Sequence, residues 1–229
     1  MCTRFALKTK PAELQKFLGL EQIFEWEARY NLAPSQPVPV VIRPLESEKR
    51  ELKFPRWGFV QSWAQGGRVL VNARSEDIQN KFLFQESFEK WRCLIPMDGF
   101  YEWRHEGKEN KPYFIRMKSG KPFGVAGLWA PQDHQKQPVD SCVVLTTEPN
   151  SVVKAIHDRM PVIIQPADFG LWLDSEHEMD FDKIEKLMRP FPEDAMEAYE
   201  VSRDMNDPQT EGPNCIEPFT NPGTLSLPF

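Results

Sequence analysis

The chain has 229 residues, 40% of them hydrophobic and 12% aromatic, and a formal net charge of −6. This length suits one large domain with its own core, and this composition excludes a mainly disordered chain. No apolar run approaches the roughly 18 residues that a membrane-spanning helix needs, and the N-terminus lacks an apolar signal core. We therefore expect a cytoplasmic protein with no membrane segment.

The four cysteines lie at positions 2, 93, 142 and 215, without a CxxC pair. This pattern argues against a disulfide scaffold and a zinc finger, and favours free thiols in a reducing compartment. His and Cys residues do not occur at the spacing of metal ligands. We expect no metal and no cofactor.

The negative charge is concentrated late in the chain. Residues 174–211 hold 13 acidic and 4 basic residues, whereas the rest of the chain holds 24 basic and 21 acidic residues. A basic groove for nucleic acid is therefore compatible with the sequence, although the composition does not require one.

In chain order, hydrophobic periodicity first predicts a helix over 10–20, which Pro11 suits at its first turn, and a strand running into a turn over Arg29–Pro34. Further strands are predicted at 38–42, 51–59, 69–73, 92–96, 99–104, 112–117, 125–129 and 141–146. Further helical segments are predicted at 77–91, 152–157, 166–173 and 181–188, with an apolar run at 160–165 and an extended tail over 207–229.

Strands outnumber helices and follow one another as in hairpins. This predicts an α+β fold with a curved, barrel-like antiparallel sheet and flanking helices. Nothing reads as a linker, so residues 1–229 are interpreted as one domain that includes the acidic segment 174–211 and the proline-rich tail 212–229.

Cys2 follows the initiator methionine, which is commonly removed before a small residue. Removal would leave an amine and a thiol on adjacent carbons, both partly nucleophilic near neutral pH. Such a pair condenses with an aldehyde to an imine and closes to a five-membered thiazolidine ring. Taken alone, Cys2 is more simply a small residue near a chain end.

Glu102 lies in the run DGFYEW at 98–103. In a strand, Phe100 and Glu102 share one face, while Tyr101 and Trp103 share the other. A carboxyl group that is partly desolvated among aromatics would have a raised pKa suited to proton transfer. An edge-strand glutamate facing water is an equally good interpretation of Glu102 alone.

His157 is the one histidine with apolar neighbours; we expect His105, His134 and His177 in polar loops. His157 can act as a general acid or base, and it can equally cap a helical turn.

Asn72 and Arg74 follow a short strand and can orient a substrate oxygen and a phosphate, or simply end the strand. Trp57 and Trp63 lie near a basic, glycine-containing loop that would suit single-stranded nucleic acid. Trp57 alone reads better as a core residue.

The order of the motifs is more specific than any one of them. MCTRF, RYNLAP, WGF, NARSE, CLIPMDGFYEW and IHDRMPVII together resemble the SRAP family, the SOS-response-associated peptidases. Members capture abasic sites in single-stranded DNA. The resemblance runs from Cys2 to about Pro166, and the chain length is closer to bacterial members than to nuclear ones.

The resemblance implies a role for each matching residue. Cys2 would form a thiazolidine with the ring-opened sugar, after self-cleavage of what precedes it. Asn72 would position the sugar or the N-terminus, Glu102 would move protons, and His157 would assist ring opening and reversal. The residues implied to contact DNA or line its site are Arg4, Asn31, Pro34, Trp57, Trp63, Arg74 and Arg159.

The implied partner is single-stranded DNA containing abasic sites, bound by a monomer. Two other functions remain open from the residues. One is an N-terminal-nucleophile amidohydrolase, in which Cys2 attacks an amide. The other is a non-catalytic module that binds single strands while Cys2 stays idle.

Overall fold

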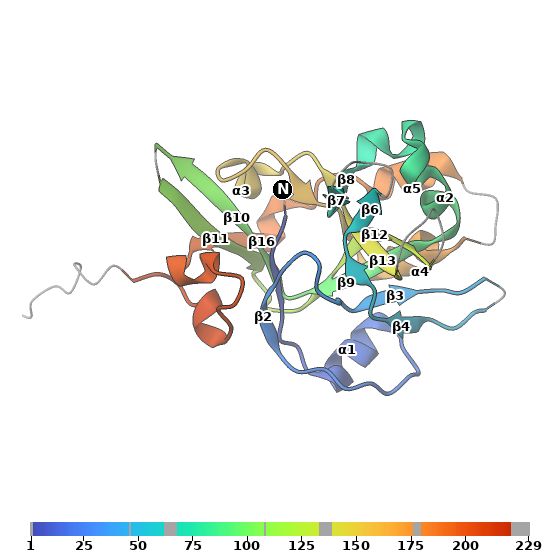
Figure 1. Ribbon diagram of the computed structural model, residues 1–229, viewed down its shortest axis with the longest axis horizontal. Helices are drawn as coiled ribbons and strands as arrows, with labels where there is room; N and C mark the ends of the chain where they lie inside the picture. Colours follow the sequence, from blue (N-terminus) through green and yellow to red (C-terminus); the bar gives the residue numbers. More distant parts are fainter. Residues whose placement is uncertain are drawn as a thin grey trace, which may run out of the picture.

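The computed structural model describes residues 2–45, 47–61, 68–107, 109–132, 139–175 and 180–220. Two sheets organise these residues (Figure 1). Within the described residues, no helix has both the length and the apolar character needed to cross a membrane. Trp63 and the tail beyond Thr220 lie outside the described residues.

The first sheet has five strands, each antiparallel to its neighbours. Their spatial order is β16 (Met196–Glu200), β11 (Glu109–Met117), β10 (Gly99–Glu106), β1 (Phe5–Leu7) and β2 (Arg29–Leu32). The N-terminal strand therefore lies directly beside the strand that carries Glu102.

The second sheet has nine strands. Its main path is β14 (Met160–Pro161), β13 (Ser141–Thr147), β12 (Phe123–Ala130), β9 (Arg92–Met97), β3 (Val40–Ile42) and β4 (Glu51–Lys53). Off this path, β15 (Ile163–Ile164) pairs with β12, while β5 (Arg56–Trp57) and β8 (Asn72–Arg74) run parallel to β13. A separate hairpin joins β6 (Phe59–Gln61) and β7 (Arg68–Leu70).

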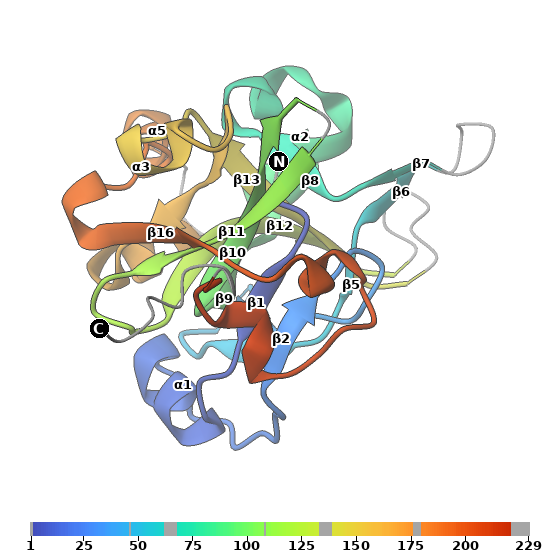
Figure 2. The ribbon, with the colours of Figure 1, turned by 90° about the vertical axis from the view of Figure 1, so that its left-hand side faces the viewer.

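The helices are short and flank the sheets, as Figures 1 and 2 show. They are α1 (Pro11–Leu18), α2 (Phe82–Lys90), α3 (Ser151–Lys154), α4 (Phe169–Leu173) and α5 (Phe181–Leu187). Short segments of 3-10 helix are η1 (Ser75–Asn80), η3 (Pro166–Asp168), η4 (Glu193–Ala195), η5 (Arg203–Asn206) and η6 (Pro213–Ile216). Helices α2 and α4 pack against β9 and thereby cover the nine-stranded sheet.

Strand β10 separates two apolar clusters. Phe100 belongs to the large central core, whereas Tyr101 belongs to a small cluster with Phe114, Met205 and Cys215. Glu102 faces the side of Phe100 and is 1% exposed, while Trp103 packs against the small cluster. The predicted two-sided pattern of this strand is confirmed.

The α+β class with mainly antiparallel sheets and flanking helices is confirmed. The sheets are curved, but the described strands do not close into a barrel. The predicted strand over 51–59 is broken into three because Pro55 lacks an N–H and Gly58 has φ 131°. A Cβ at Gly58 would meet Val69 at 2.3 Å, so the chain needs glycine at this bend.

Other expectations need correction. The helix predicted over 77–91 is two pieces, η1 and α2, because Lys81 between them has an extended backbone. Strands β1 and β16 were not expected, since the first is only three residues long and the second lies in the acidic segment. The described part of the tail is not simply extended, because η6 buries Cys215 against the small cluster.

Candidate functional site

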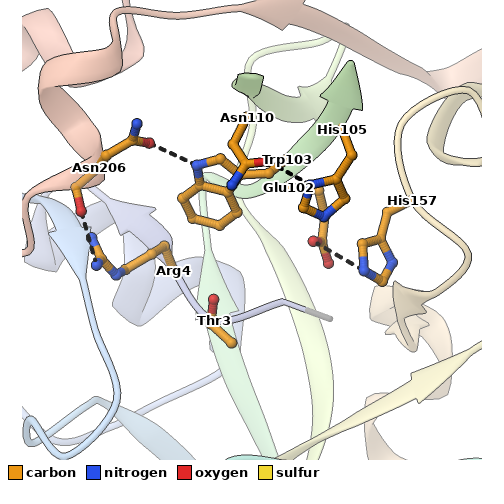
Figure 3. A pocket seen from close by; sticks show the side chains of 8 residues that line it. All are labelled: Thr3, Arg4, Glu102, Trp103, His105, Asn110, His157 and Asn206. Carbon is orange, nitrogen blue, oxygen red and sulfur yellow. Dashed lines mark hydrogen bonds and ion pairs between the residues drawn. The ribbon is translucent and has the colours of Figure 1, made fainter. Parts of the chain in front are cut away.

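A pocket of about 570 Å³ opens at the junction of β10, the N-terminal segment and the segment after α3 (Figure 3). Its lining comes from distant parts of the chain: Thr3, Arg4, Glu102, Trp103, His105, Asn110, His157 and Asn206. In Figure 3, Arg4 and Asn206 lie on one side, His105 and His157 on the other, with Trp103 between them. The pocket therefore brings a possible acid–base pair and a cation to one open space.

Cys2 lies in the segment that leads into β1 and is fully buried. Its carbonyl oxygen accepts a hydrogen bond of 2.9 Å from Asn72 Nδ2, and its thiol contacts the Arg4 carbonyl oxygen at 3.7 Å. Burial, and secondarily the Glu102 carboxylate, raise the pKa of the thiol well above its usual range. The thiol is therefore protonated at neutral pH and needs a nearby base to react.

Glu102 is placed for proton transfer by its strand. The Glu102 side chain lies on the face of β10 that is turned toward the core and is 1% exposed. This burial raises the pKa of its carboxyl group to about 7. A group with this pKa exchanges protons readily near neutral pH. This confirms that the carboxyl group is desolvated and excludes an edge-strand glutamate facing water.

His157 follows α3, and its Nε2 lies 3.8 Å from Glu102 Oε2. The backbone N–H of Arg159 donates to His157 Nδ1 at 3.0 Å, which leaves Nε2 as the ring nitrogen that faces Glu102. Burial lowers the pKa of the imidazole, although Asp158, 2.9 Å from Nδ1, acts in the opposite direction. At neutral pH the ring is thus neutral and lies beside a carboxyl group.

Arg4 and Asn31 are tied to the C-terminal part of the chain. Arg4 donates to Asn31 Oδ1 at 2.9 Å and to the Met205 carbonyl at 3.3 Å. Asn31 Nδ2 in turn donates to the carbonyls of Met205, Asp207 and Thr210. Asn31 is fully buried, so the expectation that it lines the site is wrong. Its hydrogen bonds instead hold Arg4 and the C-terminal segment together.

For Trp57, the core position favoured by the residues is confirmed, and the DNA role implied by the family resemblance is wrong. Trp57 is fully buried, its ring lies 5.3 Å from that of Phe5, and its indole N–H donates to the Val71 carbonyl. A ring in this position cannot stack on DNA, and it supports β1 instead. Pro34 is half-buried in the turn after β2 and does not line the pocket.

The two remaining arginines differ in their partners. Arg74 ends β8 and is exposed. Arg159 makes two hydrogen bonds to Glu76, of 2.7 and 2.8 Å, and one to the Thr146 carbonyl. Arg74 is therefore the more accessible of the two to a phosphate.

The sequence interpretation missed several pocket residues. His105 was expected in a loop, but it lies on β10 opposite Asn110 of β11. Trp103 donates from its indole N–H to Asn206 Oδ1 at 2.7 Å, which joins β10 to η5. The alternation DGFYEWRH carried a usable signal, because a longer strand would have included His105; no local signal pointed to Asn206.

In the part of the chain that the structure describes, His, Cys, Asp and Glu side chains do not group as three or more metal ligands.

Comparisons with known proteins identify relatives of this chain. Residues 1–208 match the family model described as SOS response associated peptidase (SRAP). The abasic site processing protein YoqW of Bacillus subtilis is 34% identical over 225 residues, which cover 95% of this chain and 99% of that protein. The abasic site processing protein YedK of Escherichia coli is 24% identical, with 95% of this chain and 100% of that protein covered.

Solved structures share the fold. A crystal structure of a protein from Bacteroides thetaiotaomicron superposes with a TM-score of 0.78 at 22% identity, covering 96% of this chain and 100% of the other. With the family match over residues 1–208 and a relative 34% identical along nearly its full length, the chain belongs to the SRAP family.

Proposed function

We propose that this protein processes abasic sites in DNA by capturing them covalently in single strands through Cys2. Relatives along the whole chain are named abasic site processing proteins. The observation that carries the finer proposal is the position of Glu102: a buried carboxyl group with a pKa of about 7, beside His157 and close enough to Cys2 to raise the thiol pKa.

The proposed reaction joins Cys2 to the open-chain form of the abasic sugar. The Cys2 amine attacks the C1′ aldehyde, and the carbinolamine loses water to give an imine. The thiol sulfur then bonds to C1′, the thiol proton leaves, and the ring nitrogen gains a proton. Aldehyde, amine and thiol thus become one thiazolidine and one water, with no oxidant or reductant.

Glu102 supplies the proton transfers that these steps require. In its protonated form it donates to the leaving hydroxyl of the carbinolamine, and in its ionised form it accepts the thiol proton. Both forms are populated near neutral pH because burial brings the pKa to about 7. His157 lies beside Glu102 and is placed to hydrogen-bond the sugar during ring opening, while the protonated Glu102 carboxyl group supplies the proton to the ring oxygen.

The amine becomes available only when the residue before Cys2 is removed. An amide nitrogen is not basic and does not condense with an aldehyde. We propose that Glu102 also serves this self-cleavage, with Asn72 holding the Cys2 carbonyl. Mass spectrometry of active protein is then expected to show Cys2 as the first residue, and a blocked N-terminus is expected to give no stable adduct.

The test is a denaturing gel of the protein with three matched single-stranded oligonucleotides: one abasic, one intact and one with a tetrahydrofuran abasic analogue that has no aldehyde. A heat-stable adduct with the abasic strand alone is expected. Equal mobility of all three would contradict capture. Ammonia release from glutamine would instead indicate the amidohydrolase, and non-denaturing binding without an adduct would indicate the binding module.

A further inference from the structure

His105 is a second imidazole in the pocket, and no step of the proposed reaction uses it. It lies near the end of β10, directly opposite Asn110 of β11. Its Nδ1 is 2.5 Å from Asn110 Oδ1, and its exposed ring lines the same pocket as Glu102 and His157 (Figure 3).

The contact with Asn110 decides which ring nitrogen can change. An amide oxygen only accepts hydrogen bonds, so His105 Nδ1 carries a proton in both charge states. Protonation therefore acts on Nε2 alone. In the neutral ring Nε2 is an acceptor that disfavours an anion, whereas in the charged ring it is an N–H donor that binds one.

The surroundings make His105 the group that decides the charge at this corner. The titratable groups that line the pocket with it are Glu102 and His157, and Asp158 lies behind them, 2.9 Å from His157 Nδ1. Among the described residues of the β10–β11 hairpin, the other cations are already in ion pairs: Arg104 and Lys111 with Glu106, and Arg116 with Glu197. Arg203 of η5 pairs with Glu109.

The opposite end of the pocket holds Arg4, with the ring of Trp103 between the two ends (Figure 3). Each sugar of a DNA strand has one phosphate on either side. A sugar held with C1′ toward Cys2 and Glu102 therefore directs its two phosphates toward opposite ends of the pocket. Arg4 is a permanent cation at one end, and His105 is a conditional one at the other.

We propose that His105, oriented by Asn110, is a proton-gated ligand for one of the two DNA phosphates that flank the abasic sugar. This inference rests on the proposed function and adds a residue and a pH dependence to its binding step. Since only the charged ring donates from Nε2, affinity for the single strand is higher when His105 is protonated than when it is neutral.

The experiment measures binding separately from capture. Full-length protein with Cys2→Ala is titrated by fluorescence anisotropy against a single strand with a tetrahydrofuran site, from about pH 5.5 to about pH 8.5. The same background carries His105→Gln, which stays neutral, or His105→Lys, which stays charged. Glu102 and His157 are unchanged throughout, so their own titration is common to all profiles.

In the parent, affinity is expected to fall about tenfold across this range, as for the loss of one charge-assisted hydrogen bond. His105→Gln should bind weakly with a flatter profile, and His105→Lys tightly with a flatter profile. At low pH, His105→Gln should also reduce the slope of log affinity against log salt by about 0.7, with no reduction at high pH. Asn110→Ala should shift the profile without removing it.

The outcomes separate the two proposals. If His105→Gln matches the parent in affinity and pH profile, the role of His105 is refuted while the proposed function stands. If no variant binds the strand and Cys2-containing protein forms no adduct, the proposed function itself fails. Circular dichroism of each variant shows whether it is folded, and His105→Lys provides rescue that a merely structural role would not produce.

Discussion

Cys2, in the segment leading into β1, and Cys142, near the start of β13, are both fully buried. Burial raises the pKa of both thiols. Cys142 is surrounded by sheet partners and lies near Cys93, another buried thiol. Beside Cys2, by contrast, lie the Glu102 carboxyl group and the Asn72 amide.

The comparison shows that thiol acidity does not distinguish the proposed nucleophile in this protein. Neither Cys2 nor Cys142 has the lowered thiol pKa that is typical of a reactive cysteine. The differences are an adjacent group that titrates near neutral pH, chain neighbours (Thr3 and Arg4) that line an open pocket, and a position at which chain cleavage creates an amine. Each of these three differences can be removed separately.

The largest effect is expected from the sulfur atom itself. Cys2→Ala should abolish the heat-stable adduct and leave non-covalent single-strand binding largely intact, because the thiol closes the ring and the cations bind the phosphates. Cys142→Ala is the matched control, since it removes an equally buried thiol. Adduct formation is read on a denaturing gel; loss in folded Cys142→Ala as well would refute Cys2 as sole nucleophile.

Removing the proton carrier comes next. Glu102→Gln keeps the shape of the side chain but cannot transfer a proton, and should slow single-turnover capture by about 10²–10⁴-fold. Glu106→Gln, on the same strand but exposed, should leave the rate unchanged. A rate for Glu102→Gln equal to the parent would reduce Glu102 to a structural residue.

Glu102→Gln, which is expected to slow capture, should increase the stability of the folded protein above neutral pH. Between pH 4.5 and about 7 the folded protein holds the Glu102 proton that the unfolded chain releases, so the free energy of unfolding falls as pH rises through this window. The shift from 4.5 to about 7 corresponds to about 3 kcal/mol.

Urea unfolding near pH 4.5 and near pH 8 tests this. Glu102→Gln should lack most of the parent's loss of stability between the two values and should be the more stable protein at the higher one. Parallel pH dependence in both proteins would mean that Glu102 is not desolvated in solution.

A smaller effect is expected from the group that holds the Cys2 backbone. Asn72→Ala removes the 2.9 Å hydrogen bond to the Cys2 carbonyl. Capture should slow about tenfold, because one such hydrogen bond contributes about 1 kcal/mol. Asn80→Ala, at an exposed position in η1, is the control. An unchanged capture rate would show that β1 alone orients Cys2.

The smallest effect concerns affinity alone. Arg74→Ala should reduce the slope of log affinity against log salt by about 0.7, as for one phosphate contact on a single strand. Lys16→Ala on α1 should not change the slope. A parent affinity independent of salt would indicate stacking without phosphate contacts.

Much of this protein follows from local patterns. The alternation Phe100–Tyr101–Glu102–Trp103 predicts a two-sided strand, and the structure confirms it. Short apolar runs bounded by Gly and Pro predict most strands, because successive side chains of a strand alternate between two faces and this pattern is visible in neighbouring residues. The order of the motifs is enough to identify the family, because a motif is recognised from its residue types and does not depend on how the chain packs.

Other properties depend on contacts that no local pattern contains. The family resemblance implied that Asn31 and Trp57 lie at the DNA site, yet both are buried, because η5 covers one and β1 covers the other. Asn206 reaches the pocket only because the C-terminal segment returns to Trp103.

The raised pKa of Glu102 shows the same division. The sequence indicates which face of β10 is apolar, but the loss of hydration that shifts a pKa depends on what distant strands place over that face. The sequence alone determined the two-sided pattern of β10 and the order of the family motifs. Tertiary structure decided the burial and charge state of Cys2, Glu102 and His157 and brought them together, because desolvation and long-range pairing are properties of the packed chain.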